Sequence, residues 1–136
     1  MTVIGVANLA VKVSDLDTAI DFYERAGAVV RDRGPWCGGE RVDVVLGALD
    51  LTLFTKAIYE GDVAGLPDDG FIHVATFTDD LDAEIEGHDV VWGPEIVSGV
   101  FGTRRIVFVD APGNMRLEFM EQLEPPPDRD AGDEGS

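Results

Sequence analysis

Cysteine and histidine are scarce in this chain, and their scarcity excludes several kinds of site. Cys37 is the single cysteine, so neither an internal disulfide framework nor a cysteine-rich zinc module can form. The two histidines, His73 and His88, restrict the metal centres that the chain can build. Any histidine-based chemistry must therefore depend on one or both of them.

Basic residues are also few, and no long hydrophobic run is present. Lys and Arg total 10 against 27 Asp and Glu, which gives a formal net charge of −17. Such a field repels phosphate backbones and anionic lipid, so we expect neither nucleic acid nor a membrane surface as a partner. The apolar N-terminal segment lacks a basic start and is interrupted by Lys12 before it reaches membrane-spanning length. We expect a cytoplasmic protein.

The composition is that of a folded domain. The chain has 136 residues, of which 45% are hydrophobic and 27% charged, a balance that supports one domain with a real core. Self-similarity then divides this domain into two halves. The segment NLAVKVSDLD (8–17) matches HVATFTDDLD (73–82), and DLTLF (50–54) matches RLEFM (116–120).

Each half parses as a strand, a helix and three further strands. Alternating apolar residues predict the strands, and one apolar stripe predicts each helix. The first half is predicted to have strands at 3–13, 28–33, 40–46 and 51–56 and a helix at 15–26. The second is predicted to have strands at 71–78, 89–97, 104–110 and 115–121 and a helix at 79–86. Ser14 is the expected cap of the first helix, and glycine and proline predict a turn or loop at 34–39.

These elements predict an α+β fold in which two βαβββ repeats form paired half-barrels around a cleft. The expected organisation is one domain with four parts. These are a first module (1–56), a connector (57–70), a second module (71–121) and a disordered acidic tail (122–136). Strand parity and the repeat together place four side chains at one point between the halves. They are Asn8, Thr52, His73 and Glu118.

The quoted motifs, together with NLAVKVSDLDTAIDFYERAG (8–27) and the closing DAPGNMRLEFME (110–121), resemble the vicinal oxygen chelate superfamily. This superfamily includes glyoxalases, bleomycin-resistance proteins and extradiol dioxygenases. The resemblance covers about residues 3–121. It implies a glyoxalase-like fold, a small molecule bound in the cleft, and a homodimer as the default assembly.

The resemblance also implies a metal site. Metal-using members place a ligand at the start and at the end of each half, where this chain has Asn8, Thr52, His73 and Glu118. A divalent ion (Zn, Fe, Mn, Co or Ni) would be held by His73 and Glu118, with Asn8 as a third ligand and water in place of Thr52. The alternative is structural. His73 can be a hydrogen-bonded core residue, and Glu118 can pair with Arg116.

The histidine count separates the chemistries of the superfamily. Extradiol cleavage needs two histidines and a carboxylate on iron. Because His88 is expected in a turn outside the cleft, only His73 is available there, and we do not expect extradiol chemistry. Proton transfer next to a carbonyl needs only a polarising ion and a carboxylate base. Glu118 is a candidate for both roles. Glu40 is a further candidate base, with Asp43 and Asp50 as alternatives.

Other side chains are candidates for contact with a ligand. Arg104 and Arg105 are expected to bind an anionic or polyhydroxylated substrate at the mouth of the cleft, unless they end a solvated strand. Trp36, Phe54 and Phe77 are expected to line a pocket for a ring, although aromatic residues also serve as plain core.

The sequence therefore predicts a metal-dependent isomerase, epimerase or lyase of the vicinal oxygen chelate type. It would act by proton transfer on a small hydroxyketone, cyclitol or 2-oxo metabolite. The alternative is a metal-free binding protein of the bleomycin-resistance type that sequesters a drug or a biosynthetic intermediate. Asn8 and Thr52 favour this alternative because they are not the usual ligands, and an acidic surface would favour cationic drugs.

Overall fold

The computed structural model of the chain describes residues 3–127, which form eight strands and two helices. The first half contains β1 (Val3–Lys12), α1 (Leu16–Arg25), β2 (Val29–Trp36), β3 (Gly39–Leu46) and β4 (Leu49–Phe54). The second half contains β5 (Gly70–Thr78), α2 (Leu81–Glu86), β6 (Val90–Gly99), β7 (Gly102–Ala111) and β8 (Met115–Glu124). Each half thus has the predicted βαβββ order.

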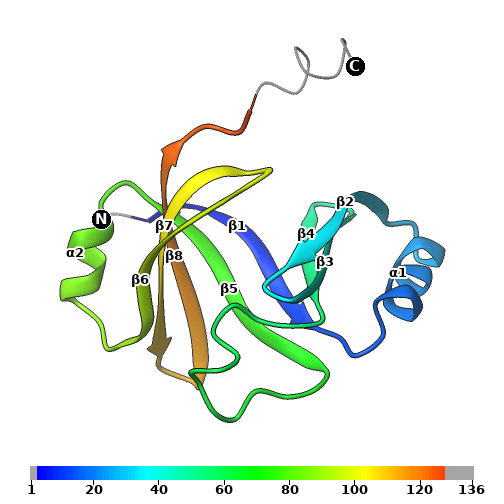
Figure 1. Ribbon diagram of the computed structural model, residues 1–136, viewed down its shortest axis with the longest axis horizontal. Helices are drawn as coiled ribbons and strands as arrows, with labels where there is room; N and C mark the ends of the chain where they lie inside the picture. The colour runs from blue at the N-terminus through cyan, green and yellow to red at the C-terminus, as the bar shows by residue number, and fades with distance from the viewer. Residues whose placement is uncertain (1–2, 128–136) are drawn as a thin grey trace.

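The eight strands form one curled sheet in the order β2-β3-β4-β1-β5-β8-β7-β6 (Figure 1). In each half the first strand runs parallel to the last, β1 beside β4 and β5 beside β8. The halves meet where β1 pairs antiparallel with β5, so that Asn8 faces Ala75 and Ala10 faces His73. This reciprocal register makes the halves pseudo-symmetric. It confirms the predicted α+β fold and places both half-barrels in one chain.

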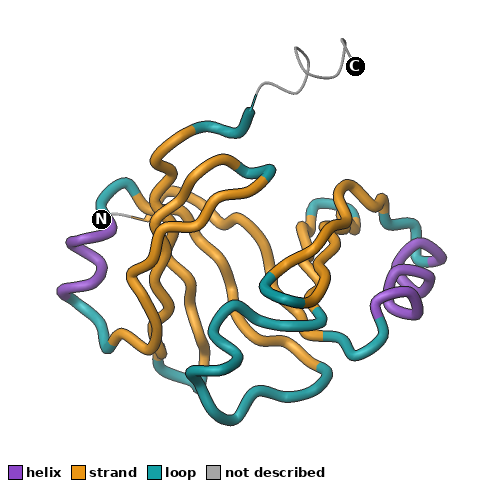
Figure 2. Tube along the Cα trace, in the orientation of Figure 1, coloured by secondary structure: helices purple, strands orange, loops and turns teal. Residues whose placement is uncertain are grey.

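The helices lie at opposite ends of the sheet (Figure 2). Leu16 of α1 packs on buried residues of β3 and β4, and Leu81 of α2 packs on β7 and β8. Asp15, and not the predicted Ser14, caps α1 by accepting a hydrogen bond from the Thr18 amide at 3.1 Å. Ser14 instead donates from its own amide to Asp69 at the end of the connector, at 2.8 Å.

The turn predicted within 34–39 is present but shorter than expected, because β2 continues through Trp36 and β3 begins at Gly39. Only Cys37 and Gly38 form the turn, and both have positive φ (52° and 86°). Pro35 is tolerated within β2 because this strand lies at the edge of the sheet, where a missing amide donor breaks no ladder. Most of the segment predicted as a turn or loop therefore belongs to the two strands of a hairpin.

The last strand is longer than predicted. β8 runs to Glu124, so residues 122–124 belong to the sheet and not to the predicted tail. Gln122 in this extension donates to the carbonyl oxygen of Phe101 at 2.9 Å. Most of the predicted tail, residues 128–136, lies outside the described residues. Within 3–127, no helix is long and apolar enough to cross a membrane.

The connector between the halves helps to build the core of the concave face. Ala57 and Tyr59 are buried there together with residues of β1, β5, β7 and β8. Lys12 of β1, which is itself buried, forms an ion pair with Glu60 at 2.7 Å. The segment predicted only as a linker therefore packs against the centre of the sheet.

Candidate functional site

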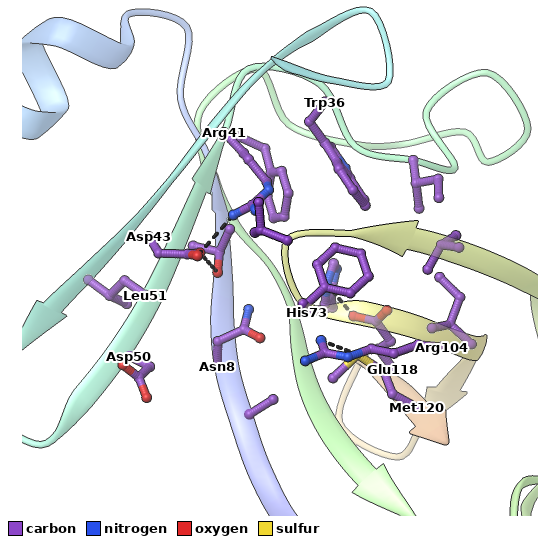
Figure 3. A pocket seen from close by; sticks show the side chains of 18 of the residues that line it. Asn8, Trp36, Arg41, Asp43, Asp50, Leu51, His73, Arg104, Glu118 and Met120 are labelled. Carbon is purple, nitrogen blue, oxygen red and sulfur yellow. Dashed lines mark hydrogen bonds and ion pairs between the residues drawn. The ribbon is translucent and has the colours of Figure 1, made fainter. Parts of the chain in front are cut away.

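A pocket of about 550 Å³ lies on the concave face between the two halves (Figure 3). Strands from both halves line it, because a curled sheet directs alternate side chains toward its hollow. The four side chains that strand parity predicted to converge all line this pocket. They are Asn8, Thr52, His73 and Glu118.

His73 and Glu118 form the polar centre of the second half. β5 and β8 are parallel neighbours with Val74 opposite Leu117, which brings the two side chains together. Nε2 of His73 lies 3.2 Å from Oε1 of Glu118. Both residues are buried, with exposed fractions of 4% and 9%. A buried imidazole and a buried carboxylate that touch each other and face a cavity are well placed to bind a ligand there or to exchange a proton with it.

Tyr59 completes this cluster from the connector. Its hydroxyl lies 2.9 Å from Nδ1 of His73, on the side of the imidazole away from Glu118. Burial raises the pKa of Tyr59 to about 12, so the hydroxyl keeps its proton at neutral pH. A hydroxyl can donate to Nδ1 or accept from it, and so supports either tautomer of His73. Sequence reasoning missed Tyr59 because no periodicity marks a residue in a connector.

The first half carries a different cluster. Thr52 donates its hydroxyl to Oδ1 of Asp43 at 2.9 Å, and Arg41 pairs with Oδ2 of the same carboxylate at 2.9 Å. Asp43 stands opposite Thr52 on β3, just as Phe108 stands opposite Glu118 on β7. The carboxylate of the first half, Asp43, therefore lies on β3 and not on β4, the strand that corresponds to β8. Thr52 on β4 orients it through the hydrogen bond.

The donors present allow a limited test for a divalent ion. Two ligands about 2.1 Å from one ion and at right angles to each other are about 3 Å apart, close to the separation of His73 and Glu118. Asn8 adds a neutral amide in the same pocket. Residues 3–127 contain no group of three or more His, Cys, Asp or Glu side chains suited to a metal ion. The residues thus fit a weakly bound ion that has two strong protein ligands, His73 and Glu118, and keeps open coordination positions.

Arg104 enters the pocket from β7 with its guanidinium held in place. The guanidinium carbon lies 5.1 Å from the ring centre of Phe77 and 4.6 Å from that of Phe101. Nε donates to Oε1 of Gln122 at 2.7 Å. Burial lowers the pKa of Arg104, although Glu118 and Asp43 act against this effect.

The predicted aromatic residues Trp36, Phe54 and Phe77 all line the pocket. The Trp36 ring also meets Phe101 edge to face, with centres 6.0 Å apart. Phe101 lies in the turn of the other half's hairpin, between β6 and β7, whereas Trp36 is the last residue of β2. The two hairpins therefore touch through aromatic rings beside the cavity.

Two predicted site residues lie outside the pocket. Glu40 precedes Arg41 on β3, so alternation turns it away, and it pairs with Arg33 at 3.4 Å. Arg105 follows Arg104 and for the same reason faces the other way, where it pairs with Asp82 at 2.8 Å. The structure thus places Glu40, the predicted base, and Arg105, a predicted ligand contact, outside the pocket that His73 and Glu118 line. Of the alternatives, Asp43 and Asp50 both line the pocket.

Several solved structures are similar to this chain. Methylmalonyl-CoA epimerase from Mycobacterium tuberculosis is 22% identical, with 89% of each chain covered and a TM-score of 0.64. A single-residue variant of the Streptomyces coelicolor methylmalonyl-CoA epimerase, in complex with 2-nitronate-propionyl-CoA, is 23% identical over 91% of this chain and 99% of that one, with a TM-score of 0.66.

A glyoxalase/bleomycin resistance protein/dioxygenase superfamily member from Vibrio splendidus 12B01 is 15% identical, covers 87% of this chain and 99% of its own, and has a TM-score of 0.59. No protein-family model and no curated protein matches the chain. At these identities the likeness concerns the fold. The chain has the fold of the vicinal oxygen chelate superfamily, as its motifs predicted.

Proposed function

We propose that this protein is a metal-dependent epimerase or isomerase, or a lyase, that moves a proton next to a carbonyl group of a small oxygenated metabolite. The observation that carries the proposal is the buried contact of His73 with Glu118 at 3.2 Å, facing a pocket of about 550 Å³. The similarity of the fold to two methylmalonyl-CoA epimerases supports the same class of reaction.

In this proposal His73 and Glu118 would hold a divalent ion, and the amide oxygen of Asn8 would be a third ligand. When bound, the ion supplies polarisation of the substrate carbonyl, which makes the adjacent C–H bond more acidic. The Tyr59 hydroxyl oxygen would then accept a hydrogen bond from the Nδ1–H group of His73, which would leave Nε2 free as a ligand. Such an outer hydrogen bond fixes the ring orientation and the tautomer of a ligating histidine.

The pocket also holds carboxylates from both halves that can exchange a proton with a substrate. Asp43 lies on the wall formed by the first half and Glu118 on the wall formed by the second (Figure 3). Epimerisation requires removal of a proton from one side of a carbon and its return from the other. Arg41 and Thr52 hold the Asp43 carboxylate in position, so Asp43 is the proposed partner base.

Deuterium uptake tests this function directly. Pyruvate and small hydroxyketones would be incubated in D₂O with the protein and added Mn²⁺, Ni²⁺ or Zn²⁺, and C–H exchange followed by proton NMR. We expect metal-dependent exchange that His73→Gln and Asp43→Asn each lower at least about 100-fold. His88→Gln is the matched control, since His88 pairs with Glu84 outside the pocket. C–H exchange that does not depend on added metal and is unchanged in His73→Gln and Asp43→Asn would refute the proposal.

A metal-free binding protein is the second candidate. It is favoured by the engagement of Thr52 with Asp43 at 2.9 Å, which leaves His73 and Glu118 as the two strong donors. Protein purified without chelator would then contain no stoichiometric metal, and His73→Ala would bind the same small molecules as the wild type. Elemental analysis of both proteins separates the two functions.

We also propose that the protein forms a homodimer. Ile4 and Val6 on β1 are 67% and 69% exposed, and β4 pairs with β1 only from Leu9 onward. This stretch therefore offers apolar side chains beside an open strand edge. Sedimentation velocity is expected to show a dimer that Val6→Glu shifts toward monomer, and a monomeric wild type would contradict it.

A further inference from the structure

Among the arginines of residues 3–127, Arg104 differs from the rest because none of the described carboxylates pairs with it. Within residues 3–127, every other arginine has a carboxylate at 2.7–3.9 Å: Arg25, Arg31, Arg33, Arg41, Arg105 and Arg116. No carboxylate of the described residues lies within ion-pair distance of Arg104. In a chain with 27 acidic and 10 basic residues, an unpaired guanidinium is unexpected. It is more unexpected in a cavity, where removal from water is costly.

The surroundings of Arg104 restrain the side chain without neutralising its charge. Phe77 and Phe101 contact the guanidinium through their rings, and Gln122 accepts from Nε at 2.7 Å. One terminal nitrogen lies 3.6 Å from the sulfur of Met120, which is a weak acceptor. The outer edge with both terminal nitrogens therefore has no charged acceptor among the described residues. A planar fork held in this way is preorganised for a planar acceptor.

We propose that Arg104 is the anchor for a carboxylate of the ligand, so that the substrate of this pocket is a carboxylic acid and not a neutral cyclitol or a cationic drug. This inference rests on the proposed function, because it concerns the same pocket. A carboxylate accepts two parallel hydrogen bonds from the edge of a guanidinium. A neutral ligand would leave the charge unpaired, and a cationic ligand would be repelled by it.

The neighbouring acids favour a singly charged group over a phosphate. Glu118 and Asp43 lie near enough to Arg104 to act on it electrostatically. Two negative charges on a phosphate would be repelled more strongly by these carboxylates than one charge on a carboxylate. Because Arg104 and Glu118 line the same pocket, the bound carboxylate would lie near the proposed reaction centre. A 2-oxo acid, with its carboxylate next to the carbonyl, meets this requirement.

Binding of pyruvate tests the anchor independently of catalysis. Pyruvate, its neutral analogue pyruvamide and inorganic phosphate would each be titrated into protein freed of metal by chelation. Chemical shifts of the Arg104 Nε–H and the Trp36 indole N–H would report binding. Arg104→Met keeps an unbranched side chain beside the Phe77 and Phe101 rings but removes the charge. Arg105→Met removes the same charge from the opposite face and is the matched control, and Arg104→Lys keeps the charge without the fork.

We expect pyruvate to bind the wild type and Arg105→Met equally, Arg104→Met to weaken binding at least about 10-fold, and Arg104→Lys to fall between them. Pyruvamide should bind no more tightly to the wild type than to Arg104→Met. Equal pyruvate affinity in the wild type and Arg104→Met, absence of pyruvate binding to the wild type, or tighter binding of phosphate would each overturn the inference. Metal-dependent exchange that persists alongside any of these results would leave the proposed function standing.

Discussion

The hydroxyl of Tyr59 lies 2.9 Å from Nδ1 of His73, so the connector between the halves holds the imidazole that faces the pocket. Tyr59 is itself fully buried, and its ring meets Phe108 edge to face with centres 4.6 Å apart. A residue outside both repeats thus determines the orientation of the central histidine. Tyr59 lies between β4 and β5, so this contact ties the connector to the second half of the sheet.

Removal of the Tyr59 hydroxyl should affect metal binding at His73 more than it affects the stability of the fold. Tyr59→Phe keeps the buried ring but leaves Nδ1 of His73 without its partner, at a cost of about 1–2 kcal/mol in the free energy of unfolding. If His73 binds a divalent ion, affinity for Mn²⁺ or Ni²⁺ should fall about 10- to 100-fold. Urea denaturation and calorimetric metal titration measure the two effects. Tyr23→Phe on α1 is the control, and equal metal affinity in both variants would count against the proposed orientation.

Introduction of a missing ligand should strengthen metal binding. Asn8 occupies the position in the first half that His73 occupies in the second, and both line the pocket. Asn8→His would replace a weak amide ligand by an imidazole, and we expect affinity for Zn²⁺ or Ni²⁺ to rise at least about 10-fold. His73→Gln in the same background should remove most of the gain. An unchanged affinity in Asn8→His would show that the four positions do not converge on one ion.

The Lys12–Glu60 pair should contribute a pH-dependent part of the stability. The hydrogen bond from Lys12 lowers the pKa of Glu60 below its usual 4.5, with smaller contributions from the Ala57 amide and Lys56. A carboxyl group with a lowered folded-state pKa stabilises the fold above its unfolded-state pKa, and this contribution is lost as the pH falls through the folded-state value.

Glu60→Gln should therefore lower the free energy of unfolding by about 2 kcal/mol at pH 7, because buried Lys12 loses its partner. The difference from the wild type should shrink as the pH falls below about 4.5. Urea denaturation between pH 3 and 7 measures it. The exposed Glu24→Gln on α1 should change stability by less than about 0.5 kcal/mol. A Glu60→Gln effect that stays constant over this range would contradict the assignment.

The hairpin that carries Phe101 depends on a glycine. Gly102 has a φ of +93°, and a side chain there would collide with the carbonyl oxygen of Glu124. Gly102→Ala should lower the free energy of unfolding by more than about 2 kcal/mol through backbone strain and the displaced strand end. Gly61→Ala, with open space around its Cα and no positive φ, should be close to neutral. Thermal denaturation compares the two, and similar midpoints would refute the predicted crowding.

Local patterns were sufficient to predict the architecture and the position of the pocket. Alternation is a consequence of backbone geometry, so the parity of Asn8 and His73 follows from their places in their strands. The repeat then aligned the two halves, which predicted that Thr52 and Glu118 would join them. Local composition was a poorer guide to the length of elements. The glycine- and proline-rich segment 34–39 is mostly strand, and Pro35 is tolerated there because β2 lies at a sheet edge, which is a property of the assembled sheet.

Side-chain partners depended on contacts between residues distant in sequence. Tyr59 reaches His73 only because the connector folds back over the sheet, and Thr52 is engaged only because Asp43 stands opposite it in the register. Arg104 and Arg105 are adjacent residues of the same type, so the sequence does not distinguish them. In the structure Arg105 pairs with Asp82, whereas Arg104 enters the pocket without a carboxylate partner among the described residues. Such differences arise from the packing of separate elements, so the chemical character of the pocket was decided by the tertiary structure.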